Sequence, residues 1–469
     1  MDRGGKKTAA AVHQEITREL DILLPRIFAE QRKTGTLDIE AVELALRTAL
    51  HAAGAAGLSE LLRQPEPVQT SVPCACGAHA RYKDMRPKPV LTALGPAKML
   101  RAYYWCSRCR QGQFPADIAR DIQNTEFSPG VRRMLALVGS ECCSFDHGRQ
   151  QMELLADLQV TAKAVERVTE AIGADIARRQ QETIQQARQL ELPVAVGQPI
   201  PKVYVQMDGT GLPIVARETE GRSGKAEDGR AHTREAKLGC VFTQTTVDEQ
   251  GRPVRDEEST TYTGAIETAA EFSRRIYTEA HQRGWSRAQV KVVMGDGADW
   301  IWNICAEQFP GAVQIVDLYH ARQHLWDLGI KLHPNDDKAK RRWVMAHQHL
   351  LDDGKIEKLV AKLRALSTET PELTASIRTE ANYFARNADR MRYPKFRKQG
   401  LFVGSGVIEA GCKTVMGSRL KRSGMFWTVR GANAVIALRC CRYSRQFDDY
   451  WEQRSAAARL RCREIRAPW

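Results

Sequence analysis

Two apolar runs that each lead to an aspartate followed by glycine constrain the fold of this chain most strongly. The first covers residues 202–207 and leads to Asp208, and the second covers residues 289–295 and leads to Asp296. Short, valine-rich apolar runs bounded by glycine are typical of buried β-strands. Polar groups gather at the carboxyl ends of the strands in an open α/β sheet. We therefore expect the two aspartates to meet at one edge of a sheet.

The order of the elements around these aspartates indicates an α/β, RNase H-like core. We expect three strands, of which the first ends at Asp208, then a helix, the strand that ends at Asp296, a second helix and a last strand. The remaining expected strands cover residues 212–217, 236–243 and 312–316, and the expected helices cover residues 265–281 and 300–309. In that fold the first and fourth strands carry the acidic residues, although strand-ending aspartates also occur in ordinary α/β domains.

Glu409 is the third acidic residue that fits such a site. It follows the glycine-rich segment 404–406 and lies in the first turn of an expected helix. Mg²⁺ prefers oxygen ligands and is often held by one or two carboxylates while it keeps several waters. Two such ions, Mg²⁺ or Mn²⁺, can activate an attacking water or hydroxyl and stabilise the leaving oxygen in phosphodiester transfer. We expect Asp208, Asp296 and Glu409 to be metal ligands and catalytic residues.

Asp317 and His320 directly follow the last expected strand. A carboxylate and a histidine three residues apart at the start of a helix share one face. His320 could bind a phosphate or assist proton transfer, or it could be a hydrogen-bonding partner behind the site. Residues 331–400 have helical periodicity throughout, which predicts an all-helical insertion between two parts of the core, 201–330 and 401–445.

Two cysteine pairs predict a zinc-ribbon-like domain in residues 66–120. They are Cys74 with Cys76 and Cys106 with Cys109, joined by a strand-like stretch at residues 90–94. Four thiolates can close the tetrahedral coordination of a structural Zn²⁺, and a segment this short gains much of its stability from the metal. Free or redox-active thiols are the alternative, because the first pair is closer in sequence than the commoner C-x-x-C.

Charge and hydropathy indicate the cellular compartment of the protein and the class of its binding partners. The net charge is +14, and residues 410–469 contain thirteen lysines and arginines against four acidic residues. This excess of positive charge favours binding of a polyanion, but it could equally serve only to keep the surface soluble. No apolar run approaches the roughly 18 residues of a membrane span, and residues 1–7 lack a signal-peptide core. We expect a cytoplasmic protein in which cysteines outside the two pairs are buried thiols, such as Cys142, Cys143, Cys240 and Cys305.

Residues 128–190 predict helices, among them 145–155, 161–172 and a polar helix 174–190. The first two of these, joined by a short turn, fit a helix-turn-helix, although any helical hairpin has the same spacing. The second helix of such a motif enters the major groove of DNA, and here it would present Lys163 and Arg167.

The two ends of the chain are predicted only in outline. The periodicity of residues 1–65 predicts a helical segment that serves packing or oligomerisation. Thr36-Leu37-Asp38 is the expected start of its second helix. Residues 446–469 are expected to form a basic C-terminal tail.

Cations alternate with aromatic side chains after Glu409. Lys413 lies four residues from Glu409, which is usually the spacing of a surface ion pair, but here it would place a cation beside the metal site. Mixed cations and rings suit phosphate contacts and stacking on an unpaired base, although Trp427 could equally pack in the core. The expected DNA-binding residues are Lys163, Arg167, Lys413, Arg419, Lys421, Arg422 and Trp427.

Taken in order, these motifs resemble those of the Mutator-like DDE transposases, and most closely the Kra group of bacterial insertion-sequence transposases. The resemblance runs from about Val72 to Arg442. It implies that Asp208, Asp296 and Glu409 are the catalytic triad, with Asp317 and His320 as active-site support. The matching stretches are Cys74–Gly77, Arg101–Cys109, Gln206–Thr210, Met294–Ala298, Asp317–His320, Gly404–Glu409 and Gly417–Trp427.

The resemblance also implies a function. It implies a DNA transposase that binds the terminal inverted repeats of its element, cleaves the 3′ ends by metal-dependent hydrolysis and joins them to target DNA. The implied partners are double-stranded DNA and further copies of the chain, at least as a dimer, in the bacterial cytoplasm and at the nucleoid when bound. Two alternatives stay open: a catalytically inactive, transposase-derived DNA-binding regulator, and an RNase H-like nuclease.

Overall fold

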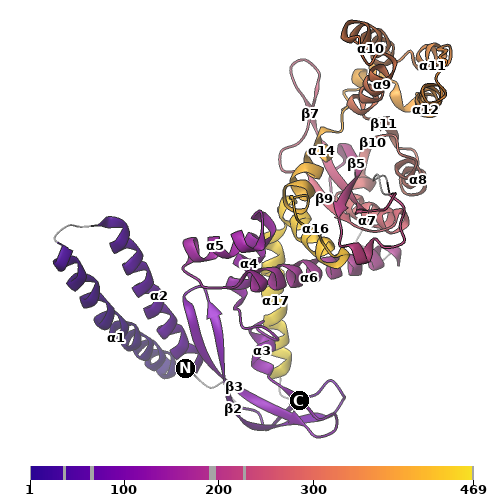
Figure 1. The fold of residues 1–469 in the computed structure, drawn as a ribbon. Coiled ribbons are helices and arrows are strands. Elements are labelled where there is room, and N and C mark those ends of the chain that lie inside the picture. Colours follow the sequence, from indigo (N-terminus) through magenta and orange to yellow (C-terminus); the bar gives the residue numbers. More distant parts are fainter. Residues whose placement is uncertain (1, 35–37, 64–67, 190–196, 225–228, 467–469) are drawn as a thin grey trace. The chain divides into compact units, whose positions relative to one another are not determined.

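The chain forms two compact units, which a computed structural model describes for residues 2–34, 38–63, 68–189, 197–224 and 229–466 (Figure 1). Unit 1 contains residues 1–170 and 447–469, and unit 2 contains residues 171–446. Each unit has its own sheet, so the fold is mixed α/β. The expected helix start at Thr36 and Leu37 and the expected helix end at Leu190 lie outside the described residues. None of the described helices is long and apolar enough to cross a membrane.

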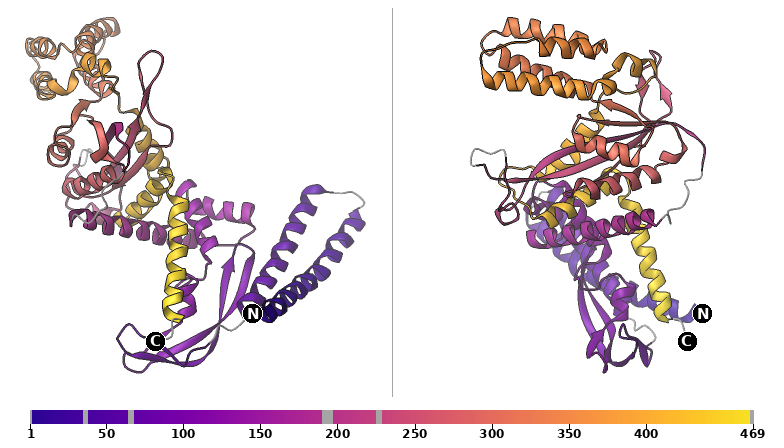
Figure 2. Two further views of the ribbon diagram at one scale, coloured as in Figure 1. Left: turned by 180° about the vertical axis from the view of Figure 1, so that it is seen from behind. Right: turned by 90° about the vertical axis from the view of Figure 1, so that its right-hand side faces the viewer.

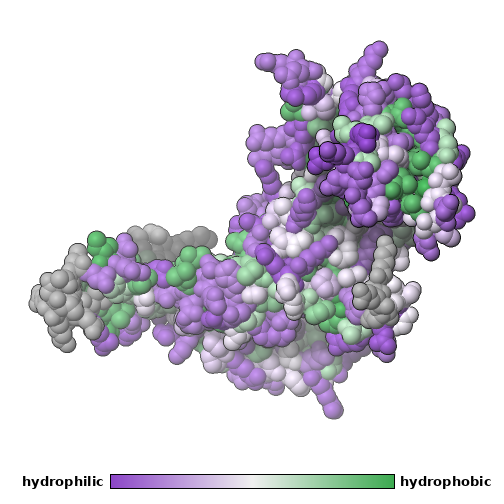
Figure 3. Space-filling view, turned by 45° about the horizontal axis from the view of Figure 1, so that its top comes forward, coloured by the Kyte–Doolittle hydropathy of each residue, from purple (hydrophilic) through white to green (hydrophobic). Residues whose placement is uncertain are grey.

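Unit 1 begins with two long helices, α1 (Asp2–Thr34) and α2 (Ile39–Arg63). Asp38 caps α2, since its Oδ1 accepts a hydrogen bond from the backbone N–H of Ala41 at 3.1 Å. The helices pack closely at Gly57, where an added Cβ would lie 2.9 Å from the Ile16 side chain. Figure 3 shows apolar side chains among hydrophilic ones on this hairpin. The exposed apolar residues are Ile22, Phe28, Ile39, Leu44, Leu50 and Leu61.

The sheet of unit 1 is antiparallel, with its four strands in sequence order. The strand expected at residues 90–94 is the end of a longer strand, and residues 93 and 94 form the turn to the next one. The cysteine pairs lie at the two other turns of the sheet. The strands are β1 (Ser71–Pro73), β2 (His79–Thr92), β3 (Gly95–Cys106) and β4 (Gln111–Gln113).

Four helices follow this sheet: α3 (Pro115–Ala119), α4 (Pro129–Glu141), α5 (Phe145–Ala156) and α6 (Ala162–Arg188). Thr161 caps α6, with its Oγ1 accepting from the Ala164 N–H at 3.0 Å. The helices expected at 161–172 and 174–190 are one helix. Gly173 between them does not end it, but allows close packing, because an added Cβ would lie 2.0 Å from the Ala434 carbonyl oxygen.

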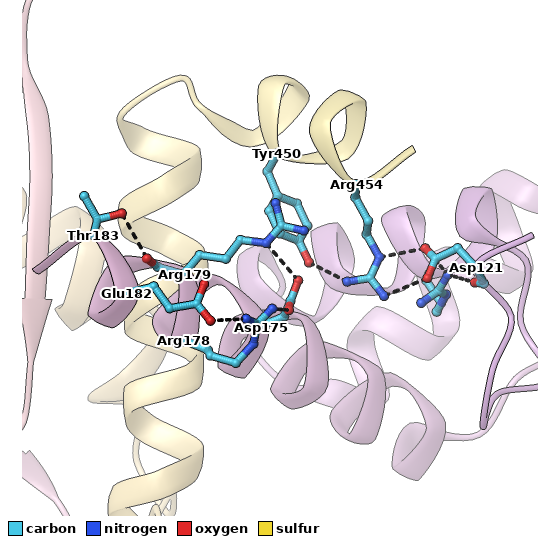
Figure 4. A network of polar contacts seen from close by, with 9 residues as sticks. Asp121, Asp175, Arg178, Arg179, Glu182, Thr183, Tyr450 and Arg454 are labelled. Carbon is cyan, nitrogen blue, oxygen red and sulfur yellow. Dashed lines mark hydrogen bonds and ion pairs between the residues drawn. The ribbon is translucent and has the colours of Figure 1, made fainter. Parts of the chain in front are cut away.

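The C-terminal residues form a helix of unit 1, α17 (Phe447–Arg466), where we expected a basic tail. We did not expect a helix here because we considered only its basic residues. Its apolar face contains Tyr450 and Trp451, which are both buried. Arg454 Nε and Nη2 donate to the Asp121 carboxylate at 2.7 and 3.0 Å (Figure 4). Arg132 Nη2 donates to the same carboxylate at 2.7 Å.

Asp121 is therefore expected to stabilise unit 1. Asp121→Asn suits the backbone φ of 52°, but leaves two largely buried guanidinium groups without their shared counter-charge. We expect urea unfolding to give a free energy of unfolding lower by about 3 kcal/mol. Asp448→Asn, in the exposed pair with Arg133, should cost under about 1 kcal/mol. Equal losses in the two variants would contradict this role.

Unit 2 is built on a five-stranded mixed sheet with the order β11-β10-β5-β6-β9. β5, β10 and β11 are parallel, whereas β6 is antiparallel to both of its neighbours. A small separate hairpin pairs β7 (Thr246–Val247) with β8 (Pro253–Val254). The five strands are β5 (Ile200–Pro213), β6 (Thr233–Gln244), β9 (Thr261–Ala265), β10 (Ala288–Gly295) and β11 (Val313–Val316).

β5 corrects the expected strand pattern. It continues through residues 209–211, where we expected a turn, so Asp208 lies inside a strand and residues 212–217 are not a second strand. The glycines there allow close approach within the sheet, since an added Cβ at Gly209 would lie 2.6 Å from Glu235 Oε1. The strand expected third, at 236–243, is the second strand β6, and the third strand is β9, which we did not expect.

Helices cover both faces of this sheet, with α7 (Ala269–Gln282) and α8 (Asp299–Gln308) preceding and following β10. An added Cβ at Gly239 of β6 would contact Phe272 and Ile276 of α7, whereas the adjacent Leu238 contacts Gly411 of α14 (Gly406–Gly411). Adjacent strand residues point to opposite faces, so α7 and α14 cover opposite faces of the sheet.

The chain between β11 and α14 is helical. Figures 1 and 2 show α10, α11 and α12 gathered next to α9. The helices are α9 (Leu318–Leu332), α10 (Asp337–Asp352), α11 (Ile356–Arg364), α12 (Pro371–Arg386) and α13 (Tyr393–Lys398). After α14 follow a π-helical segment (Cys412–Gly417), α15 (Ser418–Leu420) and α16 (Val429–Tyr443).

Candidate active site and metal centre

Asp208 lies inside β5, and Asp296 directly follows the neighbouring parallel strand β10. Gln206 pairs with Met294 in the register of β5 and β10, and each aspartate follows one of these residues by two positions. Because strand side chains alternate with period two, Asp208 shares the face of Gln206, and Asp296 follows the end of β10 at the same edge of the sheet. Burial raises the pKa of Asp208, and the charge of Asp296 raises it further.

Hydrogen bonds tie the helix that carries Glu409 to β5. The buried Gln206 side chain accepts, at Oε1, the backbone N–H of Ile408 at 3.1 Å. One turn later, Cys412 Sγ donates to Asp208 Oδ2 at 3.2 Å, and the Gly209 N–H donates to Asp208 Oδ1 at 2.7 Å. These donors oppose the rise in the pKa of Asp208. Glu409, in α14, is exposed on this side of the sheet.

Asp317 connects β11 to the same segment. It is fully buried and caps α9, with its Oδ1 accepting from the His320 N–H at 2.5 Å and its Oδ2 accepting from the Ser405 N–H. Ser405 Oγ then donates to Glu409 Oε1 at 3.1 Å. Asp317 is therefore linked to Glu409 by two hydrogen bonds through Ser405, so it supports Glu409 from behind the site. His320 is half-buried, and its ring lowers the pKa of Asp208.

Gln206 should be a structural requirement of this arrangement. Gln206→Leu removes the acceptor of the Ile408 N–H, which leaves a buried donor unpaired. We expect the free energy of unfolding to fall by about 1–3 kcal/mol in urea titrations monitored by circular dichroism. Gln250→Leu, at an exposed turn position, is the matched control and should change it by less than about 0.5 kcal/mol. A stability of Gln206→Leu equal to that of the control would show that this hydrogen bond contributes nothing.

The three acidic residues do not form a closed ligand cluster. In the described part of the chain, one group of three or more potential ligand side chains has all its ligand atoms within 4.8 Å, and it consists of four cysteines. Asp208 and Glu409 instead face Cys412 and Ser405, respectively. An open, oxygen-rich edge still suits Mg²⁺ or Mn²⁺, because these ions keep waters between themselves and some ligands.

The four-cysteine group could hold zinc. The sulfurs of Cys74 and Cys109 are 3.6 Å apart, as are those of Cys76 and Cys106. A tetrahedral site with Zn–S bonds of about 2.3 Å separates its sulfurs by about 3.8 Å, so the group fits the ion. Hydrogen bonding from the backbone of Cys109 lowers the pKa of Cys106 to about 6, whereas burial raises the pKa of Cys109 to about 12.

Of the four other cysteines that we expected to be buried, two are not fully buried. Cys240 and Cys305 are buried, as we expected, and Cys142 is half-buried, but Cys143 is exposed. Its Sγ lies 3.1 Å from His147 Nδ1 at the start of α5.

Five of the expected DNA-binding residues are exposed. The side chains of Lys163 and Arg167 on α6 are 77% and 65% exposed, and each pairs with a surface glutamate. Lys413, Lys421 and Arg422 are exposed in unit 2. Lys421 Nζ donates to Thr210 Oγ1, two residues beyond Asp208 on β5.

Arg419 and Trp427, in contrast, are buried and not available for direct DNA contact. The backbone of Trp427 pairs with the end of β5, donating to Pro213 and accepting from Val215. Its indole Nε1 donates to the Leu420 carbonyl at 3.2 Å, and the Arg419 guanidinium lies 5.0 Å from its ring centre. Both residues therefore pack the core beside β5, which was the alternative for Trp427.

Several residues of the site were missed in the sequence. Gln206 could have been found, because it lies two residues before Asp208, on the same face of the strand. Ser405 was seen only as part of a glycine-rich segment. Tyr383 has no local signal, because its contact with Asp296 joins residues 87 positions apart.

Comparison with known proteins does not assign the chain to a family. No protein-family model matches the chain, and no curated protein is similar to it in sequence. Among solved structures, it is similar to the Drosophila P element transposase strand transfer complex, with 8% sequence identity and a TM-score of 0.23. That alignment covers 72% of this chain and 83% of the other. A similarity this low does not establish the fold or the activity.

Proposed function

We propose that this protein is a DDE transposase that binds the terminal inverted repeats of an insertion sequence, cleaves their 3′ ends and transfers them to target DNA. The observation that carries the proposal is the position of its acidic residues. Asp208 lies in β5 and Asp296 directly follows the neighbouring parallel strand β10, and Gln206 ties the helix of Glu409 to β5. The sequence motifs that resemble Mutator-like transposases contain the same three residues.

The strand order supports an RNase H-like core within this proposal. β5, β6 and β9 form an antiparallel meander, and β10 and β11 extend the sheet on the other side of β5 as parallel strands. In the sequence, the helices α9–α13 follow β11 and precede α14. They therefore occupy the place of an insertion between the second and third acidic residues.

In the proposed reaction, Asp208 and Asp296 would hold and share two Mg²⁺ or Mn²⁺ ions, with Glu409 completing the second site. When bound, such ions supply activation of the attacking water or 3′-hydroxyl and stabilise the leaving oxygen. Cys412 and Gly209 orient the Asp208 carboxylate through their hydrogen bonds, and Asp317 with Ser405 does the same for Glu409.

Exposed cations would bind the DNA. Lys413 and Lys421 lie next to the helix of Glu409 and the strand of Asp208, where a scissile phosphodiester must lie. In unit 1 we propose that α5 and α6 act as a helix-turn-helix, with Lys163 and Arg167 at phosphates or base edges. We further propose that the four-cysteine sheet is a zinc ribbon. We also propose that the protein works at least as a dimer, because two element ends must be processed together.

Purified protein incubated with Mg²⁺ and DNA from either side of its gene tests the proposal. Nicks at the 3′ ends of the inverted repeats, followed by joining to a target plasmid, are expected. Specific binding of these ends without nicking would favour a DNA-binding regulator. Cleavage of RNA–DNA hybrids or branched DNA without regard to the ends would favour a nuclease.

A further inference from the structure

Tyr383, from helix α12, contacts the turn that carries Asp296. Its hydroxyl donates to the Asp296 carbonyl oxygen at 2.9 Å, and its side chain is almost fully buried. The next residue, Gly297, has a φ of 100°, and an added Cβ there would lie 2.6 Å from the Tyr383 ring. The ring therefore lies directly against the backbone of this turn and restricts its conformation.

Two further residues of the helical segment hold the Tyr383 ring in place. The imidazole of His324, on α9, stacks on it with 3.9 Å between ring centres and 19° between ring planes. His324 Nδ1 lies 2.7 Å from Glu380 Oε2 on α12. The rings of His324 and His320 form a T-shaped pair with 5.0 Å between ring centres. A continuous set of contacts thus joins α9 and α12 to Asp296 and His320.

We infer that Tyr383, supported by His324 and Glu380, is a positioning residue that orients Asp296 toward a divalent cation. The inference rests on the proposed function, because it assumes a cation at Asp296. Asp296 is the first residue beyond β10, so its carbonyl lies outside the strand and needs a separate donor. The Tyr383 hydroxyl supplies it, while the Asp296 carboxylate accepts from the Ala298 N–H at 2.9 Å. The helical segment thereby holds the Asp296 carbonyl through Tyr383, while the carboxylate is held from within its own turn by the Ala298 N–H.

A positioning role predicts weaker metal binding without loss of the fold. Tyr383→Phe keeps the ring and removes the hydroxyl. Outer-shell partners of metal ligands typically change affinity by 10-fold or more, so we expect about tenfold weaker Mn²⁺ binding. The measurement is the free Mn²⁺ signal in electron paramagnetic resonance during titration of the full-length protein with Mn²⁺ alone. Asp296→Asn, measured in parallel, identifies which bound Mn²⁺ belongs to this site.

Tyr277→Phe is the matched control, because this half-buried tyrosine lies in α7 and its ring pairs with His281 and Phe309 rather than with the turn of Asp296. It should leave the Mn²⁺ titration unchanged. His324→Ala should weaken Mn²⁺ binding in the same direction as Tyr383→Phe. The double variant should lose less than the product of the two single effects, because both act through one ring.

The outcomes separate this inference from the proposed function. Wild-type Mn²⁺ affinity in Tyr383→Phe, with binding lost in Asp296→Asn, would overturn the positioning role and leave the proposed function standing. No Mn²⁺ bound by the wild type at Asp296, together with no cleavage of element ends, would remove the proposed function itself. Weaker binding in Tyr383→Phe, with cleavage restored at saturating Mn²⁺ and an unchanged thermal midpoint, would support positioning over a purely structural role.

Discussion

Asp296→Asn is expected to abolish 3′-end cleavage while leaving binding to the element ends intact. The asparagine keeps the size of the side chain and a carbonyl oxygen, but it removes the charge that faces Asp208 and would hold a cation. Losing a preorganised electrostatic contribution of this kind costs about 10²–10³-fold in rate. The measurement is the nicking rate on labelled end DNA at a fixed Mg²⁺ concentration, with end binding measured by gel shift without metal.

Asp299→Asn is the control for this experiment. Asp299 lies three residues away in the first turn of α8, is 74% exposed and pairs with Arg386 on the surface. It should nick within about threefold of the wild-type rate, since surface substitutions rarely change stability by more than about 0.5 kcal/mol. Normal nicking by Asp296→Asn would refute the assignment of the acidic triad.

Cys106→Ser is expected to release zinc and to unfold the sheet of β1–β4. The apolar core around the cysteines is small, with Val72, Ala80 and Tyr104 as its other buried members. Structural zinc contributes about 10 kcal/mol or more in small domains, which matches the whole stability of many domains. We expect bound zinc to fall from about one ion per chain to near zero, measured by a colorimetric zinc assay.

The thermal transition of unit 1 should be lost in the same variant when it is followed by circular dichroism. Cys143→Ser is the matched control, because Cys143 is exposed and lies outside the four-cysteine group. It should keep both the zinc and the transition. A Cys106→Ser protein that binds zinc as the wild type does would contradict a four-cysteine site.

Local periodicity in the sequence predicted part of the site. The two apolar runs predict the strands that place Asp208 and Asp296, and the aspartates come to one edge of the sheet because these strands are parallel neighbours. The cysteine spacing likewise predicted four sulfurs that the structure brings within 4.8 Å of each other.

Errors arose where a residue type has two physical uses. Gly209 and Gly211 resemble a turn, but they lie in a strand and make room for side chains of β6. Trp427 and Arg419 belong to a segment rich in cations and aromatic rings, yet both are buried. Arg439 is also buried, with Nε donating to the Val415 carbonyl at 2.7 Å. A count of basic residues therefore overstates the charge available to DNA.

Contacts between distant segments had no sequence signal. Gln206 reaches Ile408 across 202 positions, and Asp317 reaches Ser405 across 88. No periodicity or spacing encodes such pairs, because they depend on how the helices α9–α13 return the chain to the sheet. These contacts nevertheless determine where Glu409 lies.

Mobilisation in cells tests the central claim most directly. A selectable marker flanked by the DNA ends found beside this gene is supplied with wild-type protein or with Glu409→Gln, at equal expression. The account predicts movement of the marker with the wild type and none with Glu409→Gln. Movement at equal frequency with both proteins would contradict a catalytic role for Glu409. No movement with either, despite specific end binding in vitro, would contradict an active transposase and indicate a DNA-binding protein.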